Sequence, residues 1–338
     1  MNFKSIAFIT PHRLGDAIFT TPFIRFLRKK CPTCEITILA TSGLAYEVYQ
    51  GNPNCTALHD ATSEKKLKLP TKRFDLIIGE TGNKRAIMIA NQLNGPCVFT
   101  AGARISLKGQ PKISIRTGTN RLEGKGIHVA QEHIRAFQKL FQLEETSENL
   151  SFDLTVEPTD RNSISRILSS QGLEASCPLI GLHIGCRNIQ KKIIFVNRDT
   201  EDLRSWRLKE ATRFCDLVAE QYPNFKCVLS GTGGEAYFNK RLAKSCSNVV
   251  DLSNRLTIKE SAALADIVRV YICTDTGMQH VISSTSAPLI GLFGSTNPTI
   301  TGPYPGRKEA TLIEAPNMEA ITASQVLAAA EPILKSYA

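Results

Sequence analysis

The sequence predicts an α/β fold in which two Rossmann-like halves follow one another along the chain. Short runs rich in β-branched residues, typical of buried strands, alternate with helix patterns through residues 1–143. After a polar stretch and one more helix pattern, the same alternation begins again at Leu179. Strand, turn and helix in this order are typical of a doubly wound parallel layer, so two such layers are expected.

The first half contains strand patterns at residues 5–10, 35–40 and 74–79. Its helix patterns lie at residues 17–30, 43–50, 84–93 and 128–143. The first of these helices ends in Arg28-Lys29-Lys30, and cations are favourable at a helix C-terminus. Residues 11–16, which include Gly15 and Asp16, are expected to form the loop between the first strand and the first helix.

The second half shows strand patterns at residues 179–184, 225–230, 249–252, 267–273 and 289–293. Its helix patterns lie at residues 208–221, 236–246, 258–265, 278–286 and 321–337, and another precedes them at 160–171. We therefore expect an N-terminal domain at residues 1–172 and a C-terminal domain at residues 173–320. The last helix, within residues 321–338, is expected to pack back on the N-terminal domain.

A chain of 338 residues with 42% hydrophobic content can bury one large core or two medium ones, and its length favours two domains. No run approaches the ~18 apolar residues of a transmembrane helix, and the N-terminus has the pattern of a first strand rather than of a signal peptide. The ten cysteines are scattered singly apart from Cys31 and Cys34, as expected of reduced thiols in a cytosolic protein. We interpret that pair as a turn between helix and strand; a redox or metal pair is the alternative.

The net charge of +10 is concentrated in the first half of the chain. Residues 1–150 hold 21 Lys and Arg against 12 Asp and Glu, a balance of +9, whereas residues 151–338 hold 20 against 19, a balance of +1. The basic half is expected to meet an anionic partner, chiefly through its polar, glycine-dotted stretch at 104–125. A phosphorylated lipid surface and a nucleic acid would both satisfy this charge, and a basic solvated surface is the alternative to either.

Two classes of function find no support among the motifs. No helix-turn-helix, zinc-finger or RNP-type motif is visible, and 7% aromatic content offers no obvious stacking platform, so no nucleic-acid partner is expected. A Rossmann oxidoreductase would carry GxGxxG between a strand and a helix, with an acidic residue downstream, and the first half has none.

The stretch from Thr274 to His280 (TDTGMQH) lies between an apolar strand pattern and a short helix pattern. In an open parallel sheet, ligands bind at the edge where the strands end, and the free N–H groups of a helix start suit phosphate. Gly277 would let the backbone approach such a group closely. The stretch therefore predicts a diphosphate site with Asp275 and His280 as its side-chain contacts.

Two motifs at opposite ends of the chain resemble the signatures of the ADP-heptose:lipopolysaccharide heptosyltransferases, glycosyltransferase family 9. The first is RLGDAIFTTP at 13–22, and the second is DTGMQH at 275–280, followed by GSTNP at 294–298 and GPY at 302–304. The resemblance implies a GT-B fold, with two Rossmann-like domains facing across a cleft, the first binding the acceptor and the second the nucleotide sugar. It also implies inverting transfer that needs no metal and no other cofactor.

By the same resemblance, the donor would be ADP-L-glycero-β-D-manno-heptose and the acceptor the inner core of lipopolysaccharide, a phosphorylated, lipid-linked acceptor of the Kdo-lipid A type. The enzyme would act in the cytoplasm at the inner face of the cytoplasmic membrane, where the basic first half would meet acceptor phosphates, acceptor carboxylates and the membrane surface. A family 9 transferase that uses another nucleotide sugar or glycan acceptor is the first alternative. A Rossmann-type nucleotide-binding protein that transfers nothing is the second.

Inverting transfer requires a base that takes the proton from the acceptor hydroxyl, and groups that hold the departing diphosphate. Asp16 matches the family's Gly-Asp position and is the expected base; the alternative is that it caps the following helix. By the resemblance, Asp275 would contact sugar hydroxyls, while the N–H groups of Thr276 and Gly277 would hold phosphate. His280 would either touch the donor or brace the loop.

Arg204 stands where the family places a Lys ahead of Trp-Pro, so it would neutralise the diphosphate, and a guanidinium can do so with two parallel hydrogen bonds. A solvated helix start is the alternative. The stretch from His183 to Trp206 is longer than the resemblance predicts, and further cations lie in it at Lys191, Lys192 and Arg198. Trp206 is interpreted as core packing.

The remaining expected contacts come from turns at strand ends. Glu235, after a glycine-rich turn, would lie near the ribose or the sugar. Additional donor contacts are expected at Gly185, Cys186, Ser295 and Thr296. Acceptor contacts are expected at Arg13, Arg116, Arg121 and Lys125.

Overall fold

The protein divides into two compact units, Met1–Thr155 and Val156–Ala338. The computed structural model describes residues 2–63, 69–81, 84–101, 113–114, 126–144, 146–185 and 204–337. The division precedes the expected boundary at residue 172, because α6 (Pro158–Ser170) packs on α9 (Ile258–Ala265) of the second unit. Arg161 of α6 pairs there with Asp266, and Ser163 donates a hydrogen bond to Glu260.

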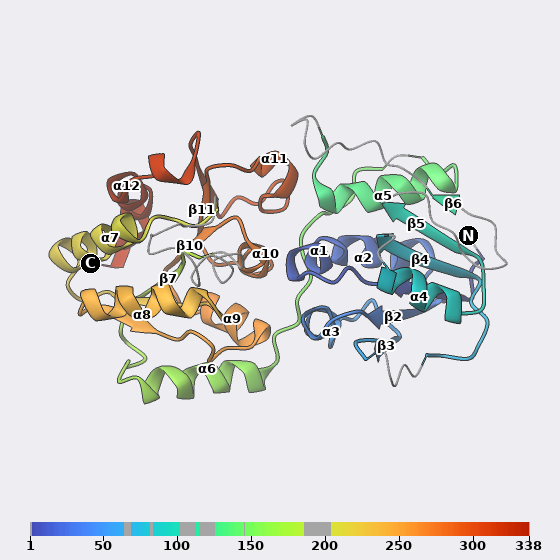
Figure 1. The fold of residues 1–338 in the computed structure, drawn as a ribbon, viewed down its shortest axis with the longest axis horizontal. Coiled ribbons are helices and arrows are strands. Elements are labelled where there is room, and N and C mark those ends of the chain that lie inside the picture. Colours follow the sequence, from blue (N-terminus) through green and yellow to red (C-terminus); the bar gives the residue numbers. More distant parts are fainter. Residues whose placement is uncertain are drawn as a thin grey trace. The chain divides into compact units, whose positions relative to one another are not determined.

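The first unit is built on a parallel sheet in the order β3-β2-β1-β4-β5-β6 (Figure 1). Its strands are β1 (Ser5–Ile9), β2 (Glu35–Ala40), β3 (Ala57–Asp60), β4 (Leu76–Thr81), β5 (Cys97–Ala101) and β6 (Ile113–Ser114). Ile6 of β1 pairs with Ile36 of β2 on one side and with Leu76 of β4 on the other. The chain order therefore reverses between β1 and β4, and such a reversal opens the ligand crevice of a doubly wound sheet.

The helices of the first unit begin with two short ones where a loop and a single helix were expected. They are α1 (Leu14–Phe19), α2 (Thr21–Lys30), α3 (Gly43–Tyr49), α4 (Lys84–Gln92) and α5 (Val129–Leu140). Pro22, in the first turn of α2, has no N–H to continue the hydrogen bonds of α1, so the chain turns at Thr20. The Thr20 hydroxyl donates to the Ala17 carbonyl at 2.7 Å, which closes the end of α1.

The Cys31–Cys34 pair forms the turn between α2 and β2. The Cys34 N–H donates to the Cys31 carbonyl at 3.1 Å, and β2 begins at the next residue. Both thiols are free and buried, and burial raises the pKa of Cys34 to about 11. The interpretation of this pair as a helix-to-strand turn is confirmed.

The second unit repeats the arrangement, with a parallel sheet in the order β12-β11-β10-β7-β8-β9. Its strands are β7 (Leu179–His183), β8 (Lys226–Leu229), β9 (Val249–Asp251), β10 (Val270–Thr274), β11 (Leu289–Phe293) and β12 (Ala310–Glu314). The helices after β7 are α7 (Leu208–Gln221), α8 (Glu235–Ser245), α9, α10 (Gly277–Ser283), α11 (Pro298–Thr301) and α12 (Ala323–Leu334). The order reverses between β7 and β10, which places the expected ligand edge of this unit at their C-terminal ends.

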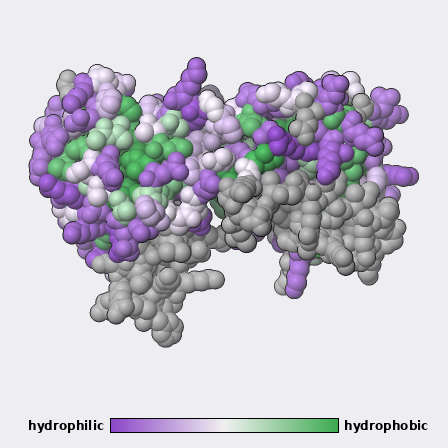
Figure 2. All heavy atoms as spheres, turned by 90° about the horizontal axis from the view of Figure 1, so that it is seen from above, coloured by the Kyte–Doolittle hydropathy of each residue, from purple (hydrophilic) through white to green (hydrophobic). Residues whose placement is uncertain are grey.

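The last helix belongs to the second unit. α12 packs on α7 and β11, and its buried face, which includes Val326 and Leu334, joins the core of that unit. The carboxylate of Glu210 on α7 accepts a hydrogen bond from the first N–H of α12, at Ala323, at 2.9 Å. This packing replaces the expectation that the C-terminal helix returns to the N-terminal domain. Figure 2 shows hydrophobic residues gathered on the upper face of this unit among hydrophilic ones.

Within the described residues, none of the helices combines the length and the apolar character needed to cross a bilayer.

Candidate functional site

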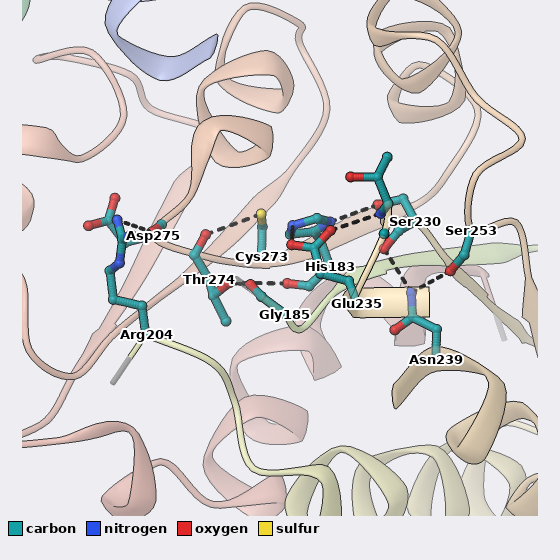
Figure 3. A network of polar contacts seen from close by, with 12 residues as sticks. His183, Gly185, Arg204, Ser230, Glu235, Asn239, Ser253, Cys273, Thr274 and Asp275 are labelled. Carbon is teal, nitrogen blue, oxygen red and sulfur yellow. Dashed lines mark hydrogen bonds and ion pairs between the residues drawn. The ribbon is translucent and has the colours of Figure 1, made fainter. Parts of the chain in front are cut away.

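The candidate site of the second unit lies where β7 and β10 end side by side. Cys273 of β10 pairs with His183 of β7, so the residues that follow both strands leave the sheet at the same edge. The Thr274 hydroxyl donates to the Gly185 carbonyl at 2.9 Å and thereby ties the two loops together (Figure 3). The β7–β10 junction therefore presents two connected loops at the edge where a doubly wound sheet binds its ligands.

Asp275 is the buried carboxylate of this edge, with 5% of its surface exposed. The Thr301 hydroxyl donates to Asp275 Oδ2 at 3.4 Å, and Arg204 Nη1 donates to the Asp275 carbonyl at 3.4 Å. Burial raises the pKa of the Asp275 carboxyl, although Thr296, the Arg204 charge and Thr301 oppose the rise. The loop after β11 and the segment before α7 thus converge on this one residue.

Thr276 and Gly277 form the start of α10 directly after Asp275. Thr276 is the N-cap, with extended backbone, and α10 runs from Gly277. Both residues are half-buried, and the first N–H groups of any helix have no partner within it. His280 lies one turn further on and is 4% exposed.

Glu235 opens α8 and turns its carboxylate toward the end of β7. Oε2 accepts a hydrogen bond from the Thr232 N–H at 2.8 Å, and Oε1 lies 3.5 Å from His183 Nε2. Burial disfavours the charged carboxylate, but the electrostatic interaction and hydrogen bond with His183, together with the Thr232 N–H, lower the pKa of Glu235 below its ordinary value. Glu235 is therefore held as a buried anion at the edge of the site.

Gly185 is required for that packing. A Cβ atom on Gly185 would lie 2.7 Å from Cγ of Glu235, closer than side-chain carbons normally approach. The residue after it, Cys186, lies outside the described residues, as do Lys191, Lys192 and Arg198.

Trp206 anchors the segment that carries Arg204. Its backbone N–H donates to the Ile184 carbonyl and its indole N–H to the Ile321 carbonyl, each at 2.9 Å. Trp206 is 1% exposed within the core of the second unit, so its interpretation as a core residue is confirmed. Because Trp206 is fixed beside β7, Arg204 two residues earlier is placed at the same edge as Asp275.

The loop after β11 completes this edge. Gly294 passes so close to the 3-10 helix at Met318–Ala320 that a Cβ atom on it would lie 2.2 Å from the Met318 nitrogen. Ser295 is exposed and Thr296 half-buried just beyond this close approach. The expected hydroxyl contacts of the loop thus lie at the C-terminal end of β11, beside the loop that carries Asp275.

In the first unit, Asp16 lies in the first turn of α1, where a loop was expected. The N-cap of α1 is Arg13, and the Arg13 carbonyl accepts the hydrogen bond of the Ala17 N–H, so Asp16 is not the cap residue itself. A carboxylate in the first helical turn is nevertheless favoured by the helix dipole. Asp16 is half-buried and Arg13 exposed. Arg116, Arg121 and Lys125 lie outside the described residues.

Sequence reasoning missed the pairing of His183 with Glu235 and a similar pair in the first unit. There, Glu80 Oε1 of β4 lies 3.9 Å from His133 Nε2 of α5, with both side chains at most 3% exposed. His133 Nδ1 lies 3.1 Å from the Thr100 hydroxyl. The sequence signal of each pair is one polar residue at or just before a strand end, His183 in β7 and Glu80 in β4, whereas the partner lies on a helix. Among the described residues, no group of three or more His, Cys, Asp or Glu side chains is arranged to hold a metal ion.

The model of glycosyltransferase family 9 (heptosyltransferase) matches residues 210–329, which span α7 to α12. This match and the relatives named next support membership in glycosyltransferase family 9. It is 26% identical over 133 residues to lipopolysaccharide heptosyltransferase 1 of Salmonella typhimurium, a match that covers 39% of this chain and 41% of that protein. It is also 22% identical over 312 residues to lipopolysaccharide heptosyltransferase 3 of Escherichia coli, covering 86% and 83%. The chain thus spans less than half the length of the Salmonella relative and most of the E. coli one.

Solved structures of family 9 share the fold along the whole chain. A family 9 glycosyltransferase from Veillonella parvula has a TM-score of 0.78 at 22% identity, covering 98% of both chains. An E. coli heptosyltransferase, WaaC with ADP, has a TM-score of 0.67 at 15% identity, covering 97% of this chain and 99% of the other. With two doubly wound units of identical strand order, the fold is the GT-B fold of this family, as predicted.

Proposed function

We propose that this family 9 protein is an inverting, metal-independent glycosyltransferase that moves heptose from ADP-L-glycero-β-D-manno-heptose to the inner core of lipopolysaccharide. The observation that carries the proposal is the convergence on Asp275, at the β7–β10 reversal, of Arg204 from the segment before α7 and of Thr301 after β11. A nucleotide diphosphate-sugar needs a carboxylate for hydroxyls and donors for phosphate at one place, and this edge provides both.

In the proposed complex, the diphosphate lies on the N–H groups of Thr276 and Gly277, with the Arg204 guanidinium beside it. A helix start and a cation together favour a phosphate through the backbone dipole and through charge-assisted hydrogen bonds. Asp275 accepts hydrogen bonds from sugar hydroxyls, and Glu235 accepts them from the ribose. Ser295 and Thr296 add hydroxyl contacts from the loop after β11.

Transfer with inversion then needs one proton acceptor and stabilisation of one leaving group. Asp16 takes the proton from the acceptor hydroxyl as that oxygen attacks the anomeric carbon. The bond from this carbon to the diphosphate breaks, and the growing negative charge on ADP is met by Arg204 and the N–H groups of α10. These residues serve both needs without a metal ion.

The acceptor proposed is phosphorylated and lipid-linked, of the Kdo-lipid A type. The balance of +9 over residues 1–150 supports this choice, since phosphates and Kdo carboxylates are anionic. We place the enzyme in the cytoplasm, peripherally bound to the inner face of the cytoplasmic membrane through the same basic half. Arg13, Arg116, Arg121 and Lys125 are the proposed acceptor contacts.

A panel of nucleotide sugars tests the donor. Purified protein is incubated with a Kdo-lipid A acceptor and with ADP-heptose, UDP-sugars or GDP-sugars in turn, and release of the nucleoside diphosphate is measured. We expect turnover with ADP-heptose alone and a product heavier by one heptose. Turnover of another nucleotide sugar in its place would establish the alternative family 9 activity, and acceptor-independent hydrolysis of every donor would refute transfer.

A further inference from the structure

A buried network of four side chains lies directly behind the donor site of the second unit. The His183 network consists of His183 at the end of β7, Ser230 after β8 and Glu235 at the start of α8, which Figure 3 shows, together with Tyr271 on β10. Each of the four is 8% exposed or less. Buried polar groups of this kind are costly unless each of them has a partner, so the arrangement constrains every member.

Two contacts fix the orientation of the His183 ring. Nδ1 lies 3.2 Å from the Ser230 hydroxyl, which in turn receives a hydrogen bond from the Tyr271 hydroxyl at 2.7 Å. With Nδ1 engaged by Ser230, Nε2 is left to face Glu235 Oε1 at 3.5 Å. A flipped ring would present carbon atoms to both partners and lose both interactions.

The sheet itself makes room for this arrangement. Tyr271 lies opposite Gly181 in the β7–β10 pairing, and a Cβ atom on Gly181 would come within 2.4 Å of the tyrosine ring. Asn239 of α8 donates to the Ser230 carbonyl at 3.1 Å and to the Ser253 hydroxyl at 2.8 Å, which fixes the turn that carries Ser230. Three strands and one helix therefore hold the network in a single geometry.

We propose that His183 is a positioning residue for donor binding, because it holds the Glu235 carboxylate in the orientation that meets the ribose of ADP. This inference rests on the proposed function and adds to it a residue that lies behind the site. The carboxylate is restrained at both oxygens, by His183 at Oε1 and by the Thr232 N–H at Oε2. Its remaining lone pairs are thereby aimed in fixed directions, and a restrained partner loses less entropy when ligand binds.

A double-mutant cycle on ADP affinity tests this coupling. The dissociation constant of ADP is measured by calorimetry for the wild type, His183→Ala, Glu235→Ala and the double variant. A hydrogen bond to a charged group is worth enough to expect a loss of about tenfold or more from each single change. If His183 acts through Glu235, the double variant binds ADP about as weakly as Glu235→Ala alone, since the second change removes nothing further.

Two conservative variants separate positioning from general support of the fold. His183→Gln keeps a donor toward Glu235 and is expected to restore ADP affinity to within about threefold of wild type, because one hydrogen bond is retained. Tyr271→Phe keeps the ring on Gly181 but removes the hydroxyl behind Ser230, and it is expected to weaken ADP binding about two- to fivefold. Both keep the side chain's volume, so they remain informative if His183→Ala does not fold.

His133→Gln is the matched control, because it alters a buried histidine that faces a glutamate in the first unit. We expect its ADP affinity to equal that of the wild type. In assays of transfer, His183→Ala should raise the KM for ADP-heptose and leave kcat within about twofold of wild type. This pattern is expected when a mutation removes an interaction that the ground state and the transition state share equally.

The outcomes distinguish this inference from the function on which it rests. The positioning role would be refuted if the losses of ADP affinity from the two single changes multiply in the double variant, or if His183→Gln loses as much ADP affinity as His183→Ala. Neither result would affect ADP binding by the wild type. A wild type that does not bind ADP would refute the proposed donor, and the inference with it.

Discussion

The substitution Gly185→Ala would displace the side chain of Glu235 without removing any charged group. The new Cβ would lie 2.7 Å from Cγ and 3.1 Å from Cβ of Glu235. Since carbon atoms pack at about 3.5–4.0 Å, the glutamate has to move. That movement breaks its 2.8 Å hydrogen bond from the Thr232 N–H and its 3.5 Å contact with His183. The Gly185 carbonyl that binds Thr274 belongs to the backbone and is kept.

The expected loss follows from what a displaced carboxylate no longer offers to ADP. Hydrogen bonds to charged groups contribute about 1.5–3 kcal/mol, which corresponds to a roughly 10- to 100-fold weaker ADP complex. The same overpacking should lower the free energy of unfolding by about 1–3 kcal/mol. Calorimetry with ADP measures the first quantity, and urea unfolding measures the second.

Gly43→Ala is the matched control for this substitution. Gly43 opens α3 in the first unit, and a Cβ atom there would have no heavy atom within 4 Å. We expect the control to bind ADP as the wild type does. If Gly185→Ala binds ADP within about twofold of wild type, a change of less than about 0.5 kcal/mol, then Glu235 is not held against Gly185 for donor binding and the reasoning fails.

Other substitutions test the remaining parts of the site. Asp16→Ala should reduce transfer to below about a tenth of wild type, as loss of a general base does, while ADP affinity stays unchanged; retained activity would refute Asp16 as the base. Asp275→Asn should weaken donor binding yet raise the melting temperature at neutral pH. Burial raises the pKa of Asp275, so ionisation of this carboxyl lowers the stability of the wild type as pH rises from the ordinary pKa through the raised pKa. The stability advantage of Asp275→Asn should therefore disappear at pH values below the ordinary pKa. Trp206→Ala should cost about 3–5 kcal/mol of stability in urea unfolding, because a fully buried indole and its bond to the Ile321 carbonyl are lost. The pKa of Glu235 is lowered, so the stability that it contributes should be complete above its ordinary pKa and should be lost as pH falls from there through the lowered pKa; in His183→Gln, acid unfolding should begin at higher pH.

Most of the inner strands of both sheets could be predicted from the sequence because both of their faces are buried, but β5, which lies between β4 and β6 with Cys97, Val98 and Phe99 buried, was not among the predicted strands. β1, β2, β7 and β11 are nearly continuous apolar runs, as parallel strands covered by helices require. The edge strands β3 and β12 lack such runs, since part of each strand is exposed, and their patterns did not indicate strands. The break between α1 and α2 had a visible cause in Pro22, but only the structure shows that the first helix already begins at Leu14, so that Asp16 lies inside its first turn.

The same distinction applies to the site. Asp275, Thr276 and Gly277 could be found from the sequence because they are contiguous and follow a buried strand, so their position at a strand end is a local property. Glu235 was found for the same reason, after its glycine-rich turn. By contrast, the contacts of Thr301 with Asp275 and of His183 with Glu235 join distant parts of the chain, and they depend on strand order and register.

The sequence by itself thus determined the two α/β units, the resemblance to family 9 and the contiguous motif after β10. Tertiary structure alone decided which side chains meet that motif, where the first unit ends and where the last helix packs. The physical reason is the distance along the chain over which each effect acts. Periodicity and turn chemistry depend on a few neighbouring residues, whereas the β7–β10 pairing brings His183 next to Cys273 and, together with the packing of α8, determines that His183 is the partner of Glu235.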